Sequence, residues 1–432
     1  MAEPRRDFTP EEYQQRVRRT RSAMADRGLD LIVVSDPSNM GWLTGYDGWS
    51  FYTHQAVLLG MEGEPVWWGR GMDALGARRT VTVADENIVG YDDIYVQNPA
   101  MHPMETLAGL IAERGWHKGR IGVELDNYYY SAAAHKALTE GLPEATVSDA
   151  TGLVNWQRAV KSPTEIEYMR RAARIVEQMH LTVVEKAEPG LAKNKLVAEI
   201  YHTAITGADG HWGDYPAIVP MAPSGMDATA PHLTWDDYPL LQDESTFFEI
   251  AGVHRRYHCP QSRTLFIGKP PQKYLDAEKA VLEAVEAGLE QAKPGNRCED
   301  IANAFNATLN RLGFVKDSRC GYSIGLSYPP DWGERTMSWR GVTTCDFVTR
   351  LPQCPGNGLP VYRDFEDAEL PRIEAFMQTP AYAAGQLVSR YYVAYLVSQE
   401  IGEAEDHEGF YLLLNGLWYD PDNAFSRHTF LT

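Results

Sequence analysis

Histidine and acidic side chains are the groups of this sequence best suited to move protons or bind metals. The chain has 12 histidines, which are scattered apart from His254 and His258 and form no HExxH motif. These two would meet on a helix, but the surrounding residues predict a β-hairpin, where we expect them on a partly solvated surface. The sequence also lacks GxGxxG and GxxxxGK(S/T), so neither type of phosphate-binding loop is present.

One short pattern is typical of a serine nucleophile. Gly321, Ser323 and Gly325 match the spacing GxSxG. A nucleophile elbow needs a strand before the serine and a helix after it. Pro329 and Pro330 follow closely and disfavour a helix there. We therefore interpret the match as a coincidence of spacing.

The first 158 residues predict an α/β domain, because helical and strand patterns alternate. Thr9 and Glu12 form a capping-box pattern with Pro10 at the first helical position, and Phe8 and Tyr13 are placed for a hydrophobic staple. The predicted helices are 10–27, 105–115 and 130–139, and the predicted strands are 31–34, 56–60, 65–68 and 120–124.

A second capping box opens another domain. Ser162, Pro163 and Glu165 precede apolar residues at helical spacing, which places a domain boundary near 155–161 and gives domains 1–158 and 159–432. From about residue 341 the hydrophobic pattern becomes irregular. In the second domain we expect strands 246–251 and 262–267 as a hairpin, followed by helices 271–293 and 299–312.

Composition narrows the class of protein. The formal net charge of −19 disfavours nucleic acids and anionic membranes as partners. No apolar stretch is long enough to span a membrane, and the N-terminus does not resemble a signal peptide. Five cysteines without CxxC spacing fit a reduced cytoplasm and no structural zinc. We expect a cytoplasmic protein.

Segments of the second domain resemble a known family. Residues 161–170 resemble the first helix of the catalytic domain in methionine aminopeptidase, prolidase and creatinase. Residues 246–252 and 261–266 are similar to the central hairpin of that domain. The resemblance implies an α+β protein, in which an N-terminal α/β creatinase-like domain precedes a pita-bread catalytic domain, a curved antiparallel sheet covered by helices.

The resemblance also identifies the positions that hold two metal ions in many relatives. Arg263 and Thr264 set the register, which puts Glu249 at the first aspartate position and Pro260 at the second. Tyr322 stands where the relatives have a histidine ligand. Proline has no donor atom, and a neutral phenol is a poor ligand for such ions. The family resemblance therefore implies that this chain has no metal cofactor.

Creatinase is the precedent in this family for hydrolysing a C–N bond without metal, with one histidine as proton shuttle. The sequence around His232 resembles the segment that carries this histidine. An imidazole can accept and return a proton near neutral pH. Residues 322–335, and residues 45–55 with Trp49 and Phe51, resemble the ectoine hydrolases of the family more than creatinase. Thr53 replaces an arginine of creatinase, which argues against creatine as substrate.

Ectoine is a cyclic amidine with a carboxylate, and the resemblance implies a site for such a molecule. Trp49, Phe51 and Tyr328 are candidates for stacking on the cationic ring. Glu249 would bind a ring N–H, and His232 would activate water, which would yield an N-acetylated 2,4-diaminobutyrate. The roles of two further residues are left open. Tyr322 would donate a hydrogen bond to the tetrahedral intermediate or only pack against its neighbours. Arg263 would bind the substrate carboxylate or form a structural ion pair.

Other interpretations remain open at this stage. A metal-dependent Xaa-Pro aminopeptidase or prolidase would share the fold, and so would a binding protein that has lost its activity. Residues 341–432 depart from the family pattern, and Glu366, Glu369 and Glu374 are not in a matching context. A replaced C-terminal segment or a disturbed reading frame would explain this equally well. Creatinase relatives are homodimers whose loop at the position of residues 45–55 reaches the other subunit's site, so we expect a homodimer.

Overall fold

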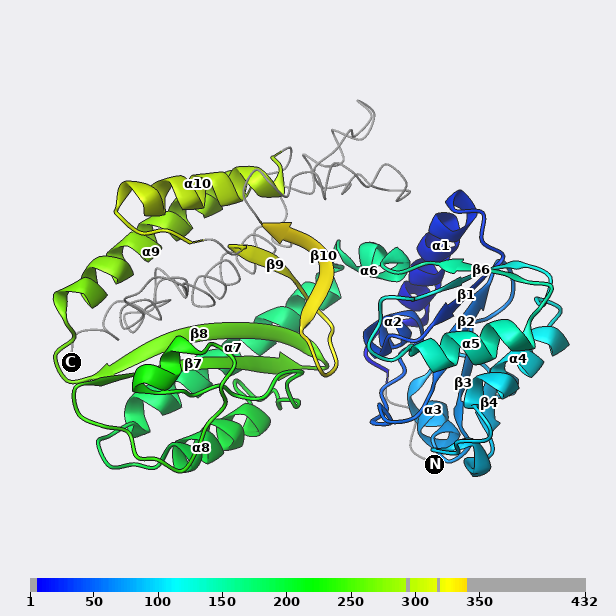
Figure 1. The fold of residues 1–432 in the computed structure, drawn as a ribbon, viewed down its shortest axis with the longest axis horizontal. Helices are drawn as coiled ribbons and strands as arrows, with labels where there is room; N and C mark the ends of the chain where they lie inside the picture. The colour runs from blue at the N-terminus through cyan, green and yellow to red at the C-terminus, as the bar shows by residue number, and fades with distance from the viewer. Residues whose placement is uncertain (1–5, 293–295, 317–318, 340–432) are drawn as a thin grey trace. The chain divides into compact units, whose positions relative to one another are not determined.

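The computed structural model describes residues 6–292, 296–316 and 319–339 of the chain. The chain divides into two compact units between Val160 and Lys161, and each is described by itself (Figure 1). The predicted departure after residue 341, with its three glutamates, lies outside the described residues.

The described part of the N-terminal unit contains a six-stranded sheet in the order β4-β3-β2-β1-β5-β6. β1 is antiparallel to β2, and β2 to β3, whereas the other neighbouring strands are parallel. The predicted hairpin and central strands are thereby confirmed. The strands are β1 (Leu31–Val34), β2 (Ala56–Gly60), β3 (Val66–Arg70), β4 (Ile88–Tyr91), β5 (Arg120–Val123) and β6 (Thr146–Asp149).

Helices accompany this sheet, and the buried apolar side chains form two clusters. One cluster includes Met24 of α1 and Leu153 of α6, and the other includes Leu107 of α4 and Leu138 of α5. The helices are α1 (Pro10–Asp26), α2 (Pro37–Thr44), α3 (Ala74–Thr80), α4 (Pro103–Glu113), α5 (Ala132–Gly141) and α6 (Leu153–Arg158), with short 3-10 turns η1 (Asp85–Asn87) and η2 (Asp93–Tyr95).

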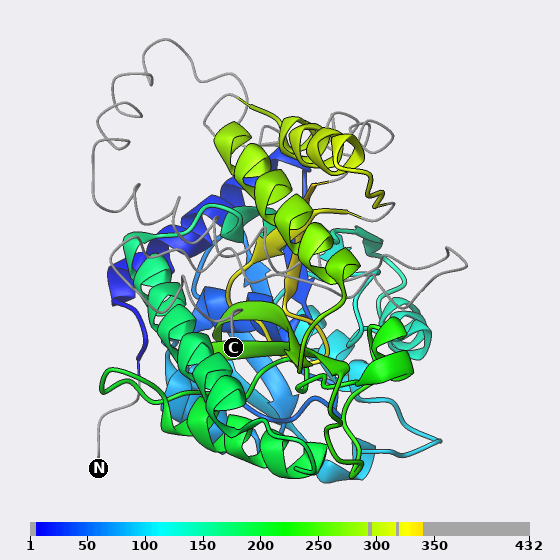
Figure 2. The same cartoon turned by 90° about the vertical axis from the view of Figure 1, so that its left-hand side faces the viewer.

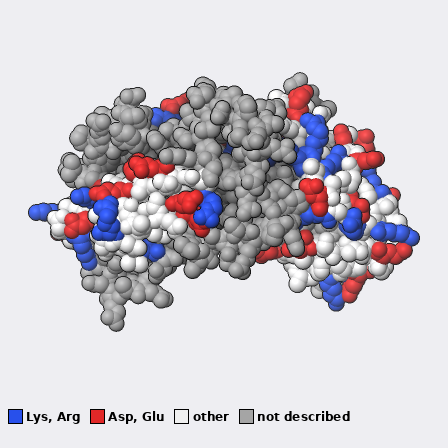
Figure 3. All heavy atoms as spheres, turned by 90° about the horizontal axis from the view of Figure 1, so that it is seen from above, with Lys and Arg blue, Asp and Glu red and all other residues white. Residues whose placement is uncertain are grey.

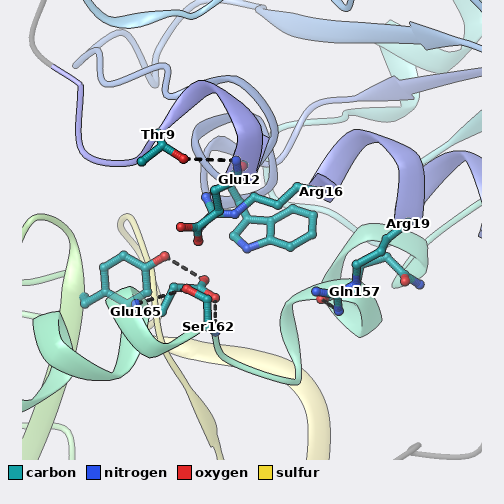
Figure 4. Close-up of polar contacts among 9 residues, drawn as sticks. Thr9, Glu12, Arg16, Arg19, Gln157, Ser162 and Glu165 are labelled. Carbon is teal, nitrogen blue, oxygen red and sulfur yellow. Dashed lines mark hydrogen bonds and ion pairs between the residues drawn. The ribbon is translucent and has the colours of Figure 1, made fainter. Parts of the chain in front are cut away.

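The two predicted helix starts are present. Thr9 caps α1 by accepting a hydrogen bond from the backbone N–H of Glu12 (Figure 4), and the Phe8 and Tyr13 rings lie edge to face 5.9 Å apart. Ser162 and Glu165 form a complete capping box at the start of α7, since each side chain accepts from the other's backbone N–H. Such caps satisfy N–H groups that have no partner within the helix.

The second unit is built around the long antiparallel hairpin of β7 (Glu244–His254) and β8 (Tyr257–Ile267). Both views show α9 and α10 side by side (Figures 1 and 2). The remaining described elements are α7 (Pro163–Lys186), α8 (Lys193–Thr206), the 3-10 turn η3 (Gly225–Thr229), α9 (Gln272–Gln291), α10 (Cys298–Arg311), β9 (Gly321–Ile324) and β10 (Gly333–Trp339).

A two-residue turn closes the hairpin. Arg255 and Arg256 both have positive φ, of 50° and 66°. This combination is that of a type I′ turn, whose twist matches the twist of paired strands. Arg256 is held by Asp214, which accepts its backbone N–H at 3.2 Å and pairs with its guanidinium at 3.3 Å.

One face of the hairpin packs on α7. Phe248, Ile250 and Cys259 belong to a hydrophobic cluster with residues of α7 and α8. Gly252 permits this packing, because a Cβ atom there would collide with the backbone of Ala172. Since side chains alternate along a strand, the residues between these apolar ones point to the opposite face.

On the face that Figure 3 shows, charged side chains of both signs are interspersed among the described residues. Among the described helices, none combines the length and the apolar character that crossing a membrane requires.

Polar groups at the ends of the parallel strands β1 and β5 form a buried network. Glu124 accepts hydrogen bonds from the backbone N–H groups of Ser35 and Asp36, at 2.7 and 2.8 Å, and from Asn39 Nδ2 at 2.6 Å. Asn39 Oδ1 accepts from the buried guanidinium of Arg158 at 2.7 Å. Burial raises the pKa of Glu124 to about 7, which the three donors oppose. The network thus joins α2, β5 and α6.

We predict that Glu124→Ala lowers the free energy of unfolding by about 2–4 kcal/mol, because three buried donors lose their acceptor. Urea unfolding followed by circular dichroism measures this. Glu62→Ala, in the exposed turn between β2 and β3, is the control and should change stability by less than about 0.5 kcal/mol. Equal effects of the two substitutions would show that the network does not stabilise the unit.

Candidate active site

Glu249 lies at the centre of β7, fully buried, on the face opposite α7. Its backbone N–H and C=O both pair with Met221, at 3.1 and 3.0 Å, so residues 221–224 line the edge of β7 that faces away from β8. Across the hairpin its register partner is Ser262. A buried carboxylate in a strand paired on both sides has a fixed position.

His232 lies in an exposed turn just after η3. The turn returns to the hairpin, because Ala222 N–H donates to Thr234 C=O at 3.2 Å, next to the Met221–Glu249 pair. The structure therefore brings the segment that carries His232 to the edge of the strand that carries Glu249. Its exposure leaves the imidazole accessible to water.

Tyr322 comes from the other side of the hairpin, on β9. It is buried, and its hydroxyl accepts a hydrogen bond from Trp332 Nε1 at 2.9 Å. The guanidinium carbon of Arg319 lies 4.5 Å from its ring centre. The segment after β9 is attached to β8, since His258 N–H donates to Gly325 C=O at 3.0 Å. β7 and β8 thus lie between the segments that carry His232 and Tyr322.

Tyr328 follows on the same segment and is also buried. The guanidinium carbon of Arg256 lies 5.5 Å from its ring centre, a cation–π contact. Ser327 N–H donates to Arg256 C=O at 2.9 Å, so this turn of the hairpin fixes the residues around Tyr328.

Ser323 is not part of a nucleophile elbow. It lies within β9, its hydroxyl shares a hydrogen bond of 2.5 Å with that of Thr336 on β10, and the described residues after it, up to 339, contain no helix. The interpretation of GxSxG as a coincidence is confirmed.

The prediction that His254 and His258 lie on a partly solvated surface was wrong, since both are buried. His254 Nδ1 contacts the C=O of Trp212 at 2.9 Å. His258 Nε2 accepts from Ala217 N–H at 2.9 Å, and Nδ1 contacts Arg256 C=O at 2.8 Å. Burial lowers the pKa of His258 to about 3, so it is neutral and structural. The prediction failed because elements far away in the sequence cover the hairpin.

Arg263 is not brought together with Glu249. It has the same strand parity as Cys259 and therefore points toward α7. Burial lowers its pKa to about 10, whereas Glu177 of α7 raises it. Burial and the nearby Arg263 charge lower the pKa of His180 on the same helix. Of the two roles considered for Arg263, this position favours the structural ion pair.

Trp49 and Phe51 belong to the N-terminal unit, whereas the other predicted site residues belong to the second. Trp49 is 61% exposed, and its ring lies edge to face with Phe51 at 4.7 Å. Phe51 in turn lies 5.9 Å from the ring of Tyr129. Trp49 and Phe51 thus form an aromatic pair at the surface of this unit.

The described residues do not fit a dinuclear metal site. Pro260 has no donor atom, and the oxygen of Tyr322 accepts from Trp332. His258, two residues before Pro260, has both ring nitrogens engaged. Over residues 6–292, 296–316 and 319–339, no group of three histidine, cysteine or acidic side chains could hold a metal ion.

Three features of this region were not predicted from the sequence. Trp332 holds Tyr322, and Lys161 Nζ forms a buried ion pair with Glu334 at 2.6 Å. Ser262 faces Glu249 on the neighbouring strand. Of these features, only the position of Ser262 could have been predicted from the sequence. Ser262 and Pro260 are two residues apart in a strand, so their side chains lie on the same face.

Two family profiles match the chain. The creatinase/prolidase N-terminal domain matches residues 16–160, and metallopeptidase family M24 matches residues 167–342. A prolidase from Thermococcus sibiricus has the same fold, with a TM-score of 0.65 at 16% identity over 76% of this chain and 86% of that one.

Curated relatives are more similar in sequence. An ectoine hydrolase from Halomonas elongata is 60% identical over 344 residues, covering 77% of this chain and 85% of the relative. A creatinase from Bacillus is 26% identical over 73% of this chain and 75% of the relative. The predicted α/β domain and pita-bread catalytic domain are confirmed, and this chain belongs to the creatinase/prolidase family with an M24-type catalytic domain.

Proposed function

We propose that this protein hydrolyses ectoine to an N-acetylated 2,4-diaminobutyrate by opening the ring at its amidine carbon. The observation that carries the proposal is the 60% identity to the Halomonas elongata ectoine hydrolase. The positions of Glu249, His232 and Tyr322 around one hairpin support it.

Glu249 would bind the substrate's cationic amidine. A carboxylate forms short, charge-assisted hydrogen bonds with such N–H groups, and these are stronger in a buried site than in water. Because Glu249 is held in the middle of a paired strand, it would present the amidine carbon in one orientation.

His232 would remove a proton from the water that attacks the amidine carbon, and would then give a proton to the departing ring nitrogen. Its exposed turn allows water to reach the imidazole. The product amine and the new amide account for the atoms of the water molecule, so no other reactant is required.

Tyr322 would stabilise the tetrahedral intermediate or serve only to pack the site. Its hydrogen bond from Trp332 fixes the phenol oxygen, which favours a role that needs a defined direction. The exposed Trp49 and the neighbouring Phe51 would stack on the substrate ring. We expect the protein to form a homodimer and to be located in the cytoplasm.

We predict that His232→Ala lowers kcat for ectoine by about 10²–10⁴-fold, because the general base is lost. His202→Ala, an exposed histidine on α8, is the matched control and should keep wild-type activity. Thermal unfolding should be unchanged in both variants. Turnover near the wild-type level in the purified His232 variant would exclude the shuttle.

Metal independence is part of the proposal, supported by the lack of a side-chain donor atom at Pro260 and by the hydrogen bond that the Tyr322 oxygen accepts from Trp332. We predict that dialysis against a chelator leaves kcat for ectoine unchanged and that added Mn²⁺ or Zn²⁺ does not raise it. Metal content measured on the same samples links activity to occupancy. Activity lost on chelation and restored by either ion would contradict this.

A further inference from the structure

Ser262 has an unusual environment for a serine. Its side chain is fully buried, and its hydroxyl has no hydrogen-bond partner within the described part of the chain. Buried hydroxyl groups are nearly always paired, because they lose their bonds to water without replacement. An orphaned hydroxyl therefore indicates strain or a functional partner that is absent from the structure.

Neighbouring hydroxyls of the same unit do have partners. Ser245 Oγ lies 3.4 Å from Tyr274 Oη, and Ser327 Oγ donates to Trp332 C=O at 3.0 Å. Ser224 and Thr246 share a hydrogen bond of 2.7 Å. The missing partner thus distinguishes Ser262 from these three serines, and the side-chain oxygen of the adjacent Gln261, which points to the other face of the strand, also has no hydrogen-bond partner within the described residues.

The direction of Ser262 is set by the hairpin. It lies directly opposite Glu249 in the strand register, and both residues are on the face that points away from α7. Side chains directly opposite each other in antiparallel strands have Cβ atoms about 4.5–5.5 Å apart. One small ligand can therefore contact both the carboxylate and the hydroxyl.

We propose that Ser262 is a substrate-binding residue that accepts one N–H of an amidinium ligand while Glu249 accepts the other. This inference rests on the proposed function. A hydroxyl next to a carboxylate suits this ligand, since an amidinium offers two N–H donors but carries one charge. The second acceptor fixes the ring's orientation without adding a second negative charge to a buried site.

The test compares Ser262→Ala with Ser245→Ala, a buried serine of the same hairpin whose hydroxyl lies near Tyr274. In Ser262→Ala we expect the Kd and KM for ectoine to rise about tenfold, as for the loss of one hydrogen bond, with a smaller change in kcat. The ligand-free Tm should stay the same or rise, because no hydrogen bond is lost. Ser245→Ala should keep the wild-type Kd for ectoine.

Calorimetric binding of ectoine and thermal unfolding separate the outcomes. A wild-type Kd and KM in Ser262→Ala, in a protein that hydrolyses ectoine, would overturn this inference and leave the proposed function standing. A lowered Tm with unchanged affinity would show that the hydroxyl is structural. Wild-type protein that neither binds nor hydrolyses ectoine would overturn both.

Discussion

The pairing register of β7 and β8 is the constraint on which the candidate site depends. A slip of one residue would move every side chain of a strand to the other face. The observed register puts the apolar Phe248, Ile250 and Cys259 against α7 and leaves Glu249 and Ser262 on the opposite face. Gly252 fixes the register further, because the approach of α7 to that position requires the absence of a side chain.

The hairpin also organises the segments on its two sides. Residues 221–224 pair with β7, and residues 325–326 pair with β8. Through these contacts the segments that carry the exposed His232 and the buried Tyr322 are attached to opposite edges of the same hairpin. The polar groups that would bind and activate a substrate thus come from three sequence segments: the hairpin, the turn with His232 and the strand with Tyr322. The hairpin is the longest of the three.

Local sequence signals predicted much of the fold. Capping at Thr9 and at Ser162 identified both helix starts, since these caps depend only on nearby residues. The hairpin was predicted at 246–251 and 262–267, yet its strands extend to Glu244–His254 and Tyr257–Ile267. The longer strands include His254 and His258, which we placed in the hairpin but on a partly solvated surface, whereas both are buried. Their burial depends on Asp214, Ala217 and residues 325–327, which no local pattern reveals.

The family resemblance assigned positions within motifs, such as those of Glu249 and Tyr322, and the roles of these residues stay predictions. The side chain of Arg263 points toward α7 and its residue Glu177. A motif match does not reveal this direction, because the direction depends on which face of the strand the residue occupies. We propose that this site opens a cyclic amidine. Incubation of the purified protein with ectoine, creatine and an X-Pro dipeptide in separate samples, followed by proton NMR, tests it most directly. We expect an N-acetylated 2,4-diaminobutyrate from ectoine and no change in the other two samples. Cleavage of the dipeptide or of creatine without turnover of ectoine, or no turnover in any sample, would contradict it.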